Sequence, residues 1–522
     1  MNSPISAIPS RTKVLVIGGG PGGAMAAILL AREGMEVVVL EREQFPRYHV
    51  GESLLTSVIP VLKFVGLYER MEAHGFVRKH GGYFTLREGA APGHIDFRKV
   101  SAHRHSYQVI RSEFDHLLLR YAAEVGAQVF EQTTVTELEL VDGRPARARW
   151  QRSGSAQGAD DSGRDRGSIE FDYVIDASGL SGLLSTKVFH DRRVQPAFTN
   201  IAVGSYWRDY VPYVAPDGTS QGGHFFMEAL EDGAGWIWAI PLHDQTLSVG
   251  VVVHAEEFTR MRAQTEDLAG VYRHGLSRAP HLRRMLAEAT QVAPVRSWRD
   301  FSYVADAFGG PGYRLVGDAA AFIDPLFSTG VHLAFLGALS ASATIAAQER
   351  GELSEAAAVE FHDQCIRKAY VRFSIIVSGM YKQIRRQDEV VLYGIGQTDF
   401  QHAFDVILPL VSGEADLPEL TDEPDGSDGT VDPGTIQRAV DFTIDMMNER
   451  AQLGTDNPAA RLFIAKAGVH EDLSADAHGA VGGRYIRMER DNLGIAEVGA
   501  RAEQIDHDKQ RLSAELLEAA EH

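Results

Sequence analysis

The chain has little cysteine and no evident targeting or membrane segment. Its 522 residues include one cysteine, Cys365, which excludes an internal disulfide and a metal site built on several cysteines. A single thiol fits a reducing compartment, so we expect the protein in the cytoplasm. The N-terminus lacks a charged stretch followed by a long apolar run, and no run approaches the roughly 20 apolar residues of a membrane span. We therefore predict neither a signal peptide nor a membrane-spanning helix.

Positive charge is also scarce. The chain carries 51 lysines and arginines against 71 aspartates and glutamates, which gives a formal net charge of −20. This acidic balance excludes nucleic acid and anionic membrane surfaces as general partners.

Metal-binding patterns are few: His470 and His478 in "HEDLSADAH" lack a convincing ligand spacing, so we predict a loop there and no metal site.

The length and the local patterns predict two or three interleaved domains with α/β elements. Residues 13–42 ("KVLVIGG", "GPGGAMAAILLAREG", "MEVVVLER") predict a strand, a glycine turn, a helix and a second strand. An amphipathic helix follows at 112–126, a hairpin encloses the polar stretch 151–168, and residues 196–255 are rich in short β-type runs. Beyond about residue 350 the pattern is mostly helical. It is interrupted by an acidic segment, 412–434, that we expect to be mobile.

The glycine turn has the spacing of a dinucleotide-binding site. Gly18, Gly20 and Gly23 in "GGGPGG" follow G-x-G-x-x-G: the first permits the turn, the second lets pyrophosphate approach the backbone, and the third allows close helix–strand packing. The phosphates would then lie at a helix N-terminus, where free N–H groups favour an anion. Glu41 ends the next strand and can accept hydrogen bonds from the ribose hydroxyls of an adenosine. A glycine turn in some other βαβ unit is the alternative.

Two further elements identify the dinucleotide. Asp318 in "VGDAAAFIDP" follows an apolar strand and could bind hydroxyls of a ribityl chain, and Asp176 lies in "DYVIDASG". Together with Arg111 and Asp115 of "YQVIRSEFD", these elements resemble the FAD-binding segments of the glutathione-reductase-like flavoproteins, in the aromatic-hydroxylase branch.

The resemblance implies FAD and the α/β fold of that branch, in an FAD-binding module of residues 1–350. The FAD-binding parts would lie at about 11–78, 106–185 and 296–350. An interleaved substrate-side β-sheet would lie at about 79–105 and 186–295, followed by a mostly helical C-terminal region, 351–522.

Four motifs narrow the family. "GWIWAIP" matches the W-x-W-x-I-P signature of the flavin-dependent halogenases, with Trp236, Trp238 and Pro241. "FIDPLFSTG" matches their F-x-x-P-x-x-S-x-G signature. "GFVRKHGGYF" resembles the segment that carries the halogenase lysine, here Lys79. "FPRYHVGESLL" resembles the segment at the flavin edge, and its Arg47 is expected at the cofactor. Taken together, the chain is identified as a member of this family, and it resembles the phenol and pyrrole branch.

The resemblance assigns roles to these residues. Reduced FAD (FADH2) and oxygen convert chloride into hypochlorous acid, and the halide is expected at the backbone N–H groups of Thr329 and Gly330, before a helix predicted at 331–347. Lys79 would then meet hypochlorous acid, either by hydrogen bonding or by forming a chloramine. A lysine shielded from water has a lowered pKa, which favours the neutral amine. Trp236 and Trp238 would keep organic substrate away from the flavin. A surface lysine and ordinary β-core packing of the tryptophans are the alternatives.

One departure bears on the substrate. Tryptophan-type halogenases carry a glutamate just before the Ser-Thr-Gly turn, whereas Phe327 stands there in this chain. A phenol or pyrrole, which activates its own ring, therefore fits better than an indole. Many relatives in this branch act on substrates tethered to an acyl or peptidyl carrier protein. A run of basic residues could dock such a carrier, but we favour the alternative that it is a solvated helix face with local charge balance. The run comprises Arg367, Lys368, Arg372, Lys382, Arg385 and Arg386.

Three functions remain open from the sequence. The first is an FADH2-dependent halogenase of an electron-rich aromatic in secondary metabolism, supplied with reduced flavin by a separate reductase because no second dinucleotide fingerprint is present. The second is an aromatic hydroxylase or a geranylgeranyl-reductase-like enzyme on the same scaffold. The third is a non-catalytic flavin-fold protein that binds a partner. The tryptophan strand and Lys79 favour the first.

Overall fold

The computed structural model describes residues 7–86, 92–101, 103–153, 164–215, 218, 222–387, 410–417 and 480–498. It begins with the predicted βαβ unit, whose two strands are parallel and almost entirely buried. Both faces of these strands are covered, which is why their apolar residues run continuously and do not alternate with polar ones. The first sheet comprises, in order, β17 (Gly309–Gly310), β18 (Tyr313–Leu315), β10 (Arg164–Asp176), β1 (Arg11–Ile17), β2 (Val37–Leu40) and β7 (Gln128–Phe130), with β8 (Thr133–Val141) and β9 (Arg144–Ser153) joined to β10.

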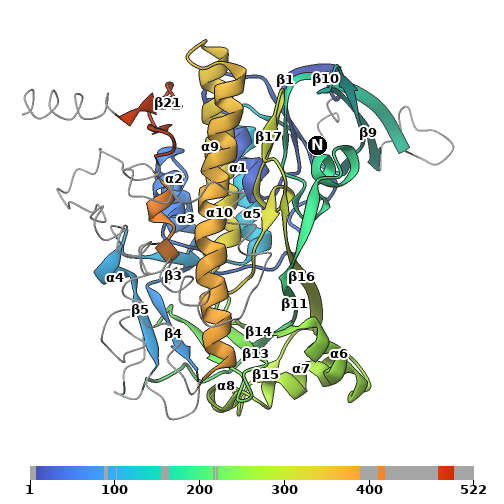
Figure 1. Cartoon of the computed structure of the whole chain (residues 1–522). Coiled ribbons are helices and arrows are strands. Elements are labelled where there is room, and N and C mark those ends of the chain that lie inside the picture. The colour runs from blue at the N-terminus through green and yellow to red at the C-terminus, as the bar shows by residue number, and fades with distance from the viewer. Residues whose placement is uncertain are drawn as a thin grey trace, which may run out of the picture.

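The carboxyl ends of β1, β10 and β18 meet at one edge of this sheet, because the three strands are parallel neighbours. The turns that follow them therefore lie together, as in other α/β folds that bind ligands at this edge. At the opposite end of the same sheet, β8 and β9 continue β10 as an antiparallel extension (Figure 1). The predicted hairpin is confirmed by β9 and β10, but residues 151–153 and 164–168, expected in its loop, belong to these strands, and residues 154–163 lie outside the described residues.

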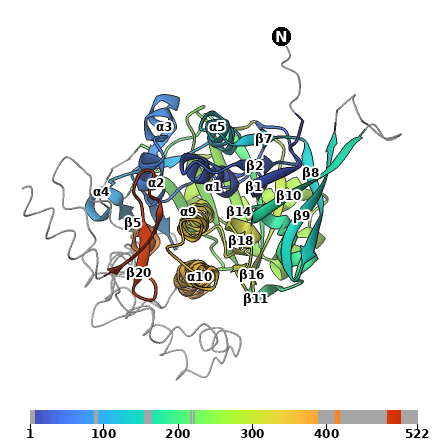
Figure 2. The same ribbon diagram turned by 90° about the horizontal axis from the view of Figure 1, so that it is seen from above.

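Helices cover the first sheet. Helix α1 (Pro21–Arg32) packs between α5 (Arg111–Glu124) and α9 (Thr329–Glu349), and α10 (Glu355–Arg385) runs along α9 (Figure 2). Among the described residues, one helix, α9, has the length and the apolar composition needed to cross a membrane, which contradicts our prediction that no such stretch exists. Since 94% of its most apolar stretch is buried inside the protein, its composition is accounted for by the core.

The second sheet lies beneath the first in Figure 1. Helices α6 (Ala255–Ala263), α7 (Leu268–Leu276) and α8 (Pro280–Met285) cover one of its faces and share an apolar core with it. Strands β16 and β19, which the sequence placed with the FAD-binding part, pair with this sheet. The order of the sheet is β19 (Ala321–Phe322), β16 (Arg296–Ala305), β11 (Arg192–Arg208), β14 (Leu247–His254), β13 (Gly235–Pro241), β12 (Phe225–Ala229), β4 (Gly81–Thr85) and β5 (Gly93–Asp96), with β15 (Thr290–Gln291) beside β11.

The side chains of strand β13 alternate between two apolar cores. Trp236, Trp238 and Ile240 pack into the core shared with the first sheet, whereas Ile237 and Ala239 pack into the core under α6 to α8. The remaining short elements connect the two sheets. They are α2 (Val58–Phe64), α3 (Tyr68–His74), β3 (Val77–Lys79), α4 (Phe97–Val100), β6 (Ser106–Gln108) and the helical turns Gly179–Ser181, Leu184–Val188 and Gly317–Ala319.

Part of the acidic segment is packed, which contradicts the prediction of mobility for residues 412–417. The Asp416 carboxylate is buried and accepts hydrogen bonds from Arg372 at 2.9 Å and from His332 at 3.1 Å. These long-range partners hold a stretch that is polar by composition. Residues 418–434, His470 and His478 lie outside the described residues. Further on, β20 (Arg484–Arg487) and β21 (Gly494–Glu497) form a hairpin against α9, in a region where the sequence predicted helix.

Candidate functional site

A cavity of about 490 Å³ lies between the two sheets, at the carboxyl ends of β1, β10 and β18. Its wall includes the turns after these strands, the first residues of α1 and α9, and side chains from β12, β13 and β16. The sequence-predicted residues that line it are Gly18, Gly20, Glu41, Arg47, Arg111, Trp236, Trp238, Asp318, Thr329 and Gly330. Gly23, Lys79, Asp176 and Pro241 do not line it.

The glycines serve distinct purposes in the first turn. Gly18 has a φ of +102°, and a Cβ there would lie 2.3 Å from the carbonyl oxygen of Ala177. A Cβ on Gly23 would lie 1.9 Å from the carbonyl oxygen of Gly18, so helix α1 could not approach β1 with any larger residue. Gly20 is different, because it borders the cavity and its nearest neighbour would be Arg47 at 3.4 Å. The first N–H groups of α1 therefore face the cavity without intrahelical acceptors, as a phosphate requires.

Glu41 lies at the end of β2 and its carboxylate is fixed by two backbone donors. The N–H of Gly19 donates to Oε2 at 2.6 Å, and the N–H of Glu43 donates to Oε1 at 2.7 Å. A carboxylate can accept about four hydrogen bonds, so capacity remains for the hydroxyls of a ribose. The side chain is buried and lines the cavity, in agreement with the predicted position.

Two arginines share one buried aspartate. Arg111 donates to both oxygens of Asp115, from Nε at 2.8 Å and from Nη2 at 3.0 Å, and Arg47 donates to Asp115 at 3.0 Å. Arg111 also donates to the carbonyl oxygens of Val50 and Gly51, at 2.8 and 3.3 Å. Asp115 thus holds both guanidinium groups at the cavity, and Arg111 fixes the segment that follows Arg47. Both arginines lie where an anionic cofactor would gain from positive charge.

The two aspartates after parallel strands differ in their surroundings. Asp318 lines the cavity, and burial raises the pKa of its carboxyl to about 6. Asp176 is fully buried away from the cavity, where its carboxylate accepts from the backbone N–H groups of Ser178 at 3.1 Å and Leu184 at 2.7 Å. Asp176 therefore shapes the turn 177–184, and residues of that turn line the cavity while Asp176 itself does not.

The N-terminus of α9 points at the cavity. Ser328, which precedes the helix, adopts a φ of +59°, the left-handed region, and so turns the chain sharply into the first helical residue. Thr329 and Gly330 come next, and both line the cavity. Their N–H groups have no intrahelical acceptor, and the dipole of a 21-residue helix favours an anion at this end.

The two tryptophans of β13 form part of the cavity wall, with ring centroids 6.1 Å apart. Each indole N–H has a fixed acceptor: Trp238 donates to Ser248 Oγ at 3.1 Å, and Trp236 donates to the hydroxyl of Tyr381 at 2.9 Å. Tyr381 in turn donates to Asp324, which also lines the cavity. Burial raises the pKa of the Asp324 carboxyl to about 7.

Lys79 lies at the end of β3 and is 2% exposed. Its Nζ donates to the carbonyl oxygen of Leu54 at 2.9 Å and lies 4.8 Å from the ring centre of Phe225 and 5.4 Å from that of Phe97. No carboxylate is bonded to it in the part of the chain that the structure describes. Burial lowers the pKa of Lys79 to about 7. The lysine does not line the cavity, but Phe225 does, so that ring separates the two.

Several cavity residues were missed from the sequence. Glu52 is 2% exposed and accepts from Tyr206 at 2.7 Å and Ser248 at 3.2 Å, and Trp298 adds a third indole from β16. Asp324 is another acid of the cavity wall that the sequence analysis did not single out. Glu52 and Asp324 lie inside segments whose motifs were recognised, so their position in "VGESLL" and "FIDP" was an available signal. Trp298 reaches the site only through the pairing of β16 with β11, which no local pattern encodes.

The wall thus offers free helix N–H groups, a carboxylate at the end of β2 and two arginines, a set that fits the phosphates and ribose of a dinucleotide. The family model described as an FAD binding domain matches residues 11–370. The chain is 42% identical to the flavin-dependent halogenase armH1 of Armillaria mellea, over 79% of each chain. It is 41% identical to the sulochrin halogenase gedL of Aspergillus terreus, over 79% of this chain and 77% of the relative.

Solved structures of similar fold agree with these relatives. The flavin-dependent halogenase CmlS matches with a TM-score of 0.67 and 28% identity, over 93% of this chain and 84% of CmlS. The likeness therefore extends over both sheets and the helices between them.

Proposed function

This chain belongs to the flavin-dependent halogenases, a family of FAD-dependent oxidoreductases, and on that basis we propose that it chlorinates a free phenolic or pyrrolic substrate through Lys79. Enzymes of the family use a separate flavin reductase and act on aromatic substrates. The observation that carries the proposal is the place of Lys79, a buried amine with no carboxylate partner among the described residues, separated from the cavity by the ring of Phe225.

The cavity residues hold FAD in this proposal. The N-terminus of α1 binds the pyrophosphate, Glu41 binds the ribose of the adenosine, and Asp318 binds the ribityl chain. Arg47 and Arg111 supply positive charge next to the phosphates. When FAD is bound and reduced, it and oxygen together supply the oxidising equivalents that convert chloride into hypochlorous acid. Trp236 and Trp238 exclude organic molecules from that part of the cavity.

Chloride is held by the N-terminus of α9. The N–H groups of Thr329 and Gly330 lack acceptors in the helix, and both residues face the cavity. An anion there is stabilised by hydrogen bonds and by the helix dipole in a site shielded from water. No lysine or arginine is needed for this binding.

Lys79 then positions the oxidant for the aromatic ring. With a pKa of about 7, roughly half of the amine is neutral at pH 7 and can hydrogen-bond hypochlorous acid. In the overall step, the ring carbon forms a bond to chlorine, the oxygen–chlorine bond breaks, and the ring proton leaves with the hydroxide as water. The chain gains and loses no electrons in this step, since the oxidising equivalent came from hypochlorous acid.

The residues around this step favour an activated, untethered substrate. Phe327 is buried against Phe84 and offers no carboxylate at the position before the Ser-Thr-Gly turn, which favours a ring that is electron-rich by itself. Two members of the basic run on α10 are charge-balanced, because Arg367 is paired with Asp363 and Arg372 with buried Asp416, and this favours a free substrate over one docked through a carrier protein.

The test is chlorination measured by mass spectrometry. The enzyme is incubated with a flavin reductase, NADH, FAD, oxygen and chloride, across free and carrier-bound phenols and pyrroles. We expect a mass gain of one chlorine on free phenols or pyrroles, lost in Lys79→Ala and kept in Lys99→Ala, a variant of an exposed lysine. A gain of oxygen would identify a hydroxylase, and chlorination of carrier-bound substrates alone would overturn the free-substrate assignment.

A further inference from the structure

Three short segments form a ladder next to Lys79. Ser53 pairs in antiparallel fashion with Gln108 of β6, and Gln108 pairs with Val77 of β3, two positions before Lys79. Directly opposed residues of antiparallel strands project to the same face, and so do alternate residues of one strand. The side chains of Ser53, Gln108 and Lys79 therefore share one face of the ladder.

The two ends of this row lie in different places. Ser53 belongs to the cavity wall, whereas Lys79 lies outside it and Gln108 is fully buried. The Nε2 of Gln108 donates to the carbonyl oxygen of Gly223 at 3.3 Å, shortly before Phe225, the ring that borders both the cavity and Lys79. The side chains of Ser53 and Gln108 thus lead from the cavity, past the ring of Phe225, towards the amine of Lys79.

Two polar atoms along the row are buried without a hydrogen-bond partner among the described residues: Ser53 Oγ and Gln108 Oε1. A buried polar atom left unpaired costs free energy, so most such atoms in proteins have a partner, and exceptions call for a physical explanation. The amide of Gln108 is oriented by Gly223, which leaves Oε1 as its accepting end.

We propose that Ser53 and Gln108 form a polar passage that transfers intact hypohalous acid from the flavin cavity to Lys79. This inference rests on the proposed function. Ser53 receives the molecule at the cavity wall, and Gln108 Oε1 accepts its O–H and turns the halogen towards Lys79. No bond forms or breaks at either residue. Both side chains lack the sulfur that such an oxidant attacks readily, and the rings of Phe97 and Phe225 exclude larger molecules.

The test measures how the oxidant is partitioned. In Gln108→Leu, and to a smaller degree in Ser53→Ala, we expect halogenated product per oxidised flavin to fall about tenfold, the effect of losing one hydrogen bond of about 1.4 kcal/mol. Hypohalous acid trapped in solution by an added scavenger should rise correspondingly. Gln128→Leu, a variant of an exposed glutamine on β7, should match the wild type.

A second readout needs no flavin. The pKa of Lys79, measured on FAD-free protein from the pH dependence of its acetylation by mass spectrometry, should remain near 7 in Gln108→Leu. A normal ratio of product to oxidised flavin in Gln108→Leu would overturn the passage. Loss of product together with a displaced Lys79 pKa and no trapped oxidant would overturn it as well, because Gln108 would then only support the fold. A wild type that halogenates nothing would instead overturn the proposed function.

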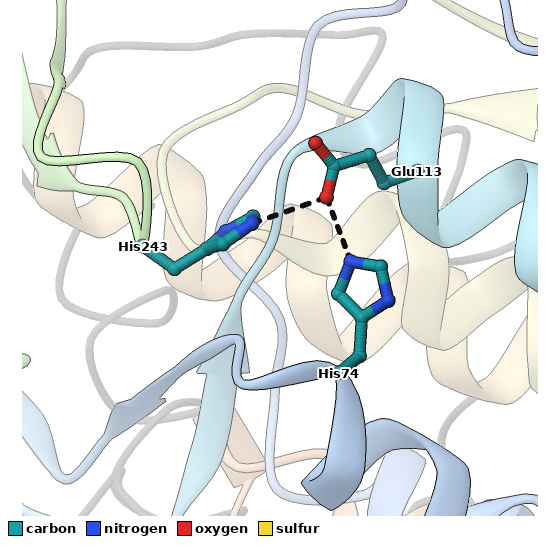
Figure 3. A group of neighbouring side chains, drawn as sticks. All are labelled: His74, Glu113 and His243. Carbon is teal, nitrogen blue, oxygen red and sulfur yellow. Dashed lines mark hydrogen bonds and ion pairs between the residues drawn. The ribbon is translucent and has the colours of Figure 1, made fainter.

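A separate cluster carries a second inference. His74, Glu113 and His243 come from the end of α3, the first turn of α5 and the turn after β13, and their side chains converge (Figure 3). The Nε2 atoms of His74 and His243 lie 2.7 and 3.1 Å from the same oxygen of Glu113, and none of the three residues lines the cavity. Phe76 stacks on His74 at 4.2 Å and meets His243 edge-on at 5.3 Å, which fixes both rings.

From this geometry we infer a transition-metal site that takes Zn²⁺ through two imidazole nitrogens and one carboxylate oxygen. The three donor atoms lie within 4.8 Å of one another, and metal–ligand distances of about 2.0–2.2 Å need only small side-chain movements. Water would complete the coordination. An ion here would link three elements: the end of α3, the first turn of α5 and the turn after β13. Its role would therefore be structural.

Calorimetric titration of Zn²⁺ alone into chelator-treated, FAD-free protein without a histidine tag tests this site. We expect one equivalent to bind and to raise the melting temperature. Affinity should fall at least about tenfold in His74→Ala and in His243→Ala, since each removes one ligand. His274→Ala, outside the cluster, should bind as the wild type does. No saturable binding, or binding that persists in the double variant of His74 and His243, would overturn the site.

Discussion

At the scale of single residues, the burial of Lys79 couples the protonation of its amine to the stability of the protein. Its pKa is lowered from 10.5 to about 7 by burial, so the folded protein binds fewer protons than the unfolded chain between these values. Stability therefore rises with pH across this window and shows no such slope below pH 7, where both states are protonated. The neutral amine, which the proposed reaction uses, is thus also the form that the fold tolerates.

This gives a prediction on unfolding. Between pH 7 and pH 9, the free energy of unfolding should rise more steeply with pH in the wild type than in Lys79→Met. The difference between the two slopes should reach up to about 1.4 kcal/mol per pH unit. Denaturant titrations of both proteins at pH 6.5, 8 and 9 measure the difference, with Lys99→Met as the exposed control. Parallel curves for wild type and Lys79→Met would contradict a buried amine with a lowered pKa.

At the scale of elements, Tyr381 of α10 ties the tryptophan strand to the segment before α9. Its hydroxyl accepts from Trp236 and donates to Asp324, which Asn200 of β11 also contacts at 2.7 Å. Tyr381→Phe leaves the indole N–H without its acceptor. We expect a loss of about 1–3 kcal/mol in the free energy of unfolding. Tyr210→Phe is a half-buried control, and equal effects of the two variants would refute the network.

A second prediction concerns the contact of α10 with residues 410–417. Arg372 and Asp416 form a buried pair at 2.9 Å, and Asp416 also meets His332 of α9. Arg372→Leu leaves a buried carboxylate without its strongest partner and should cost about 3–5 kcal/mol of stability. Adding Asp416→Asn should restore part of that loss, because the neutral amide needs no counter-charge. A double variant no more stable than Arg372→Leu would contradict this reading.

At the scale of the whole molecule, the cofactor cavity lies between the two sheets, so FAD should stabilise them together. At a free FAD concentration of 100 times Kd, linkage adds about 2.7 kcal/mol to the free energy of unfolding. Thermal scans with and without FAD should show a single transition that moves upward. In Glu41→Ala the shift should shrink, because a ribose contact is lost. Two separate transitions, of which FAD moves only one, would contradict a shared cavity.

The sequence predicted what depends on local geometry. Gly18 is required by its positive φ and Gly23 by its close contact with Gly18, and both requirements arise inside one βαβ unit. Thr329 and Gly330, which the motif resemblance singled out, line the cavity wall, and their role in halide binding stays a prediction. What it could not predict depends on distant partners: the carboxylate of Asp176 turns to its own loop, and Asp416 is buried because Arg372 lies opposite.

The ring of Phe225 between the cavity and Lys79 has a consequence for how such enzymes diversify. In the function proposed above, the oxidant is produced on one side of this ring and the aromatic substrate is chosen on the other, at Lys79. Mutations around Lys79 can then change which natural product is modified without altering the flavin compartment. A single oxidising module can in this way serve many biosynthetic lineages, and directed evolution of substrate range can leave the residues around FAD untouched.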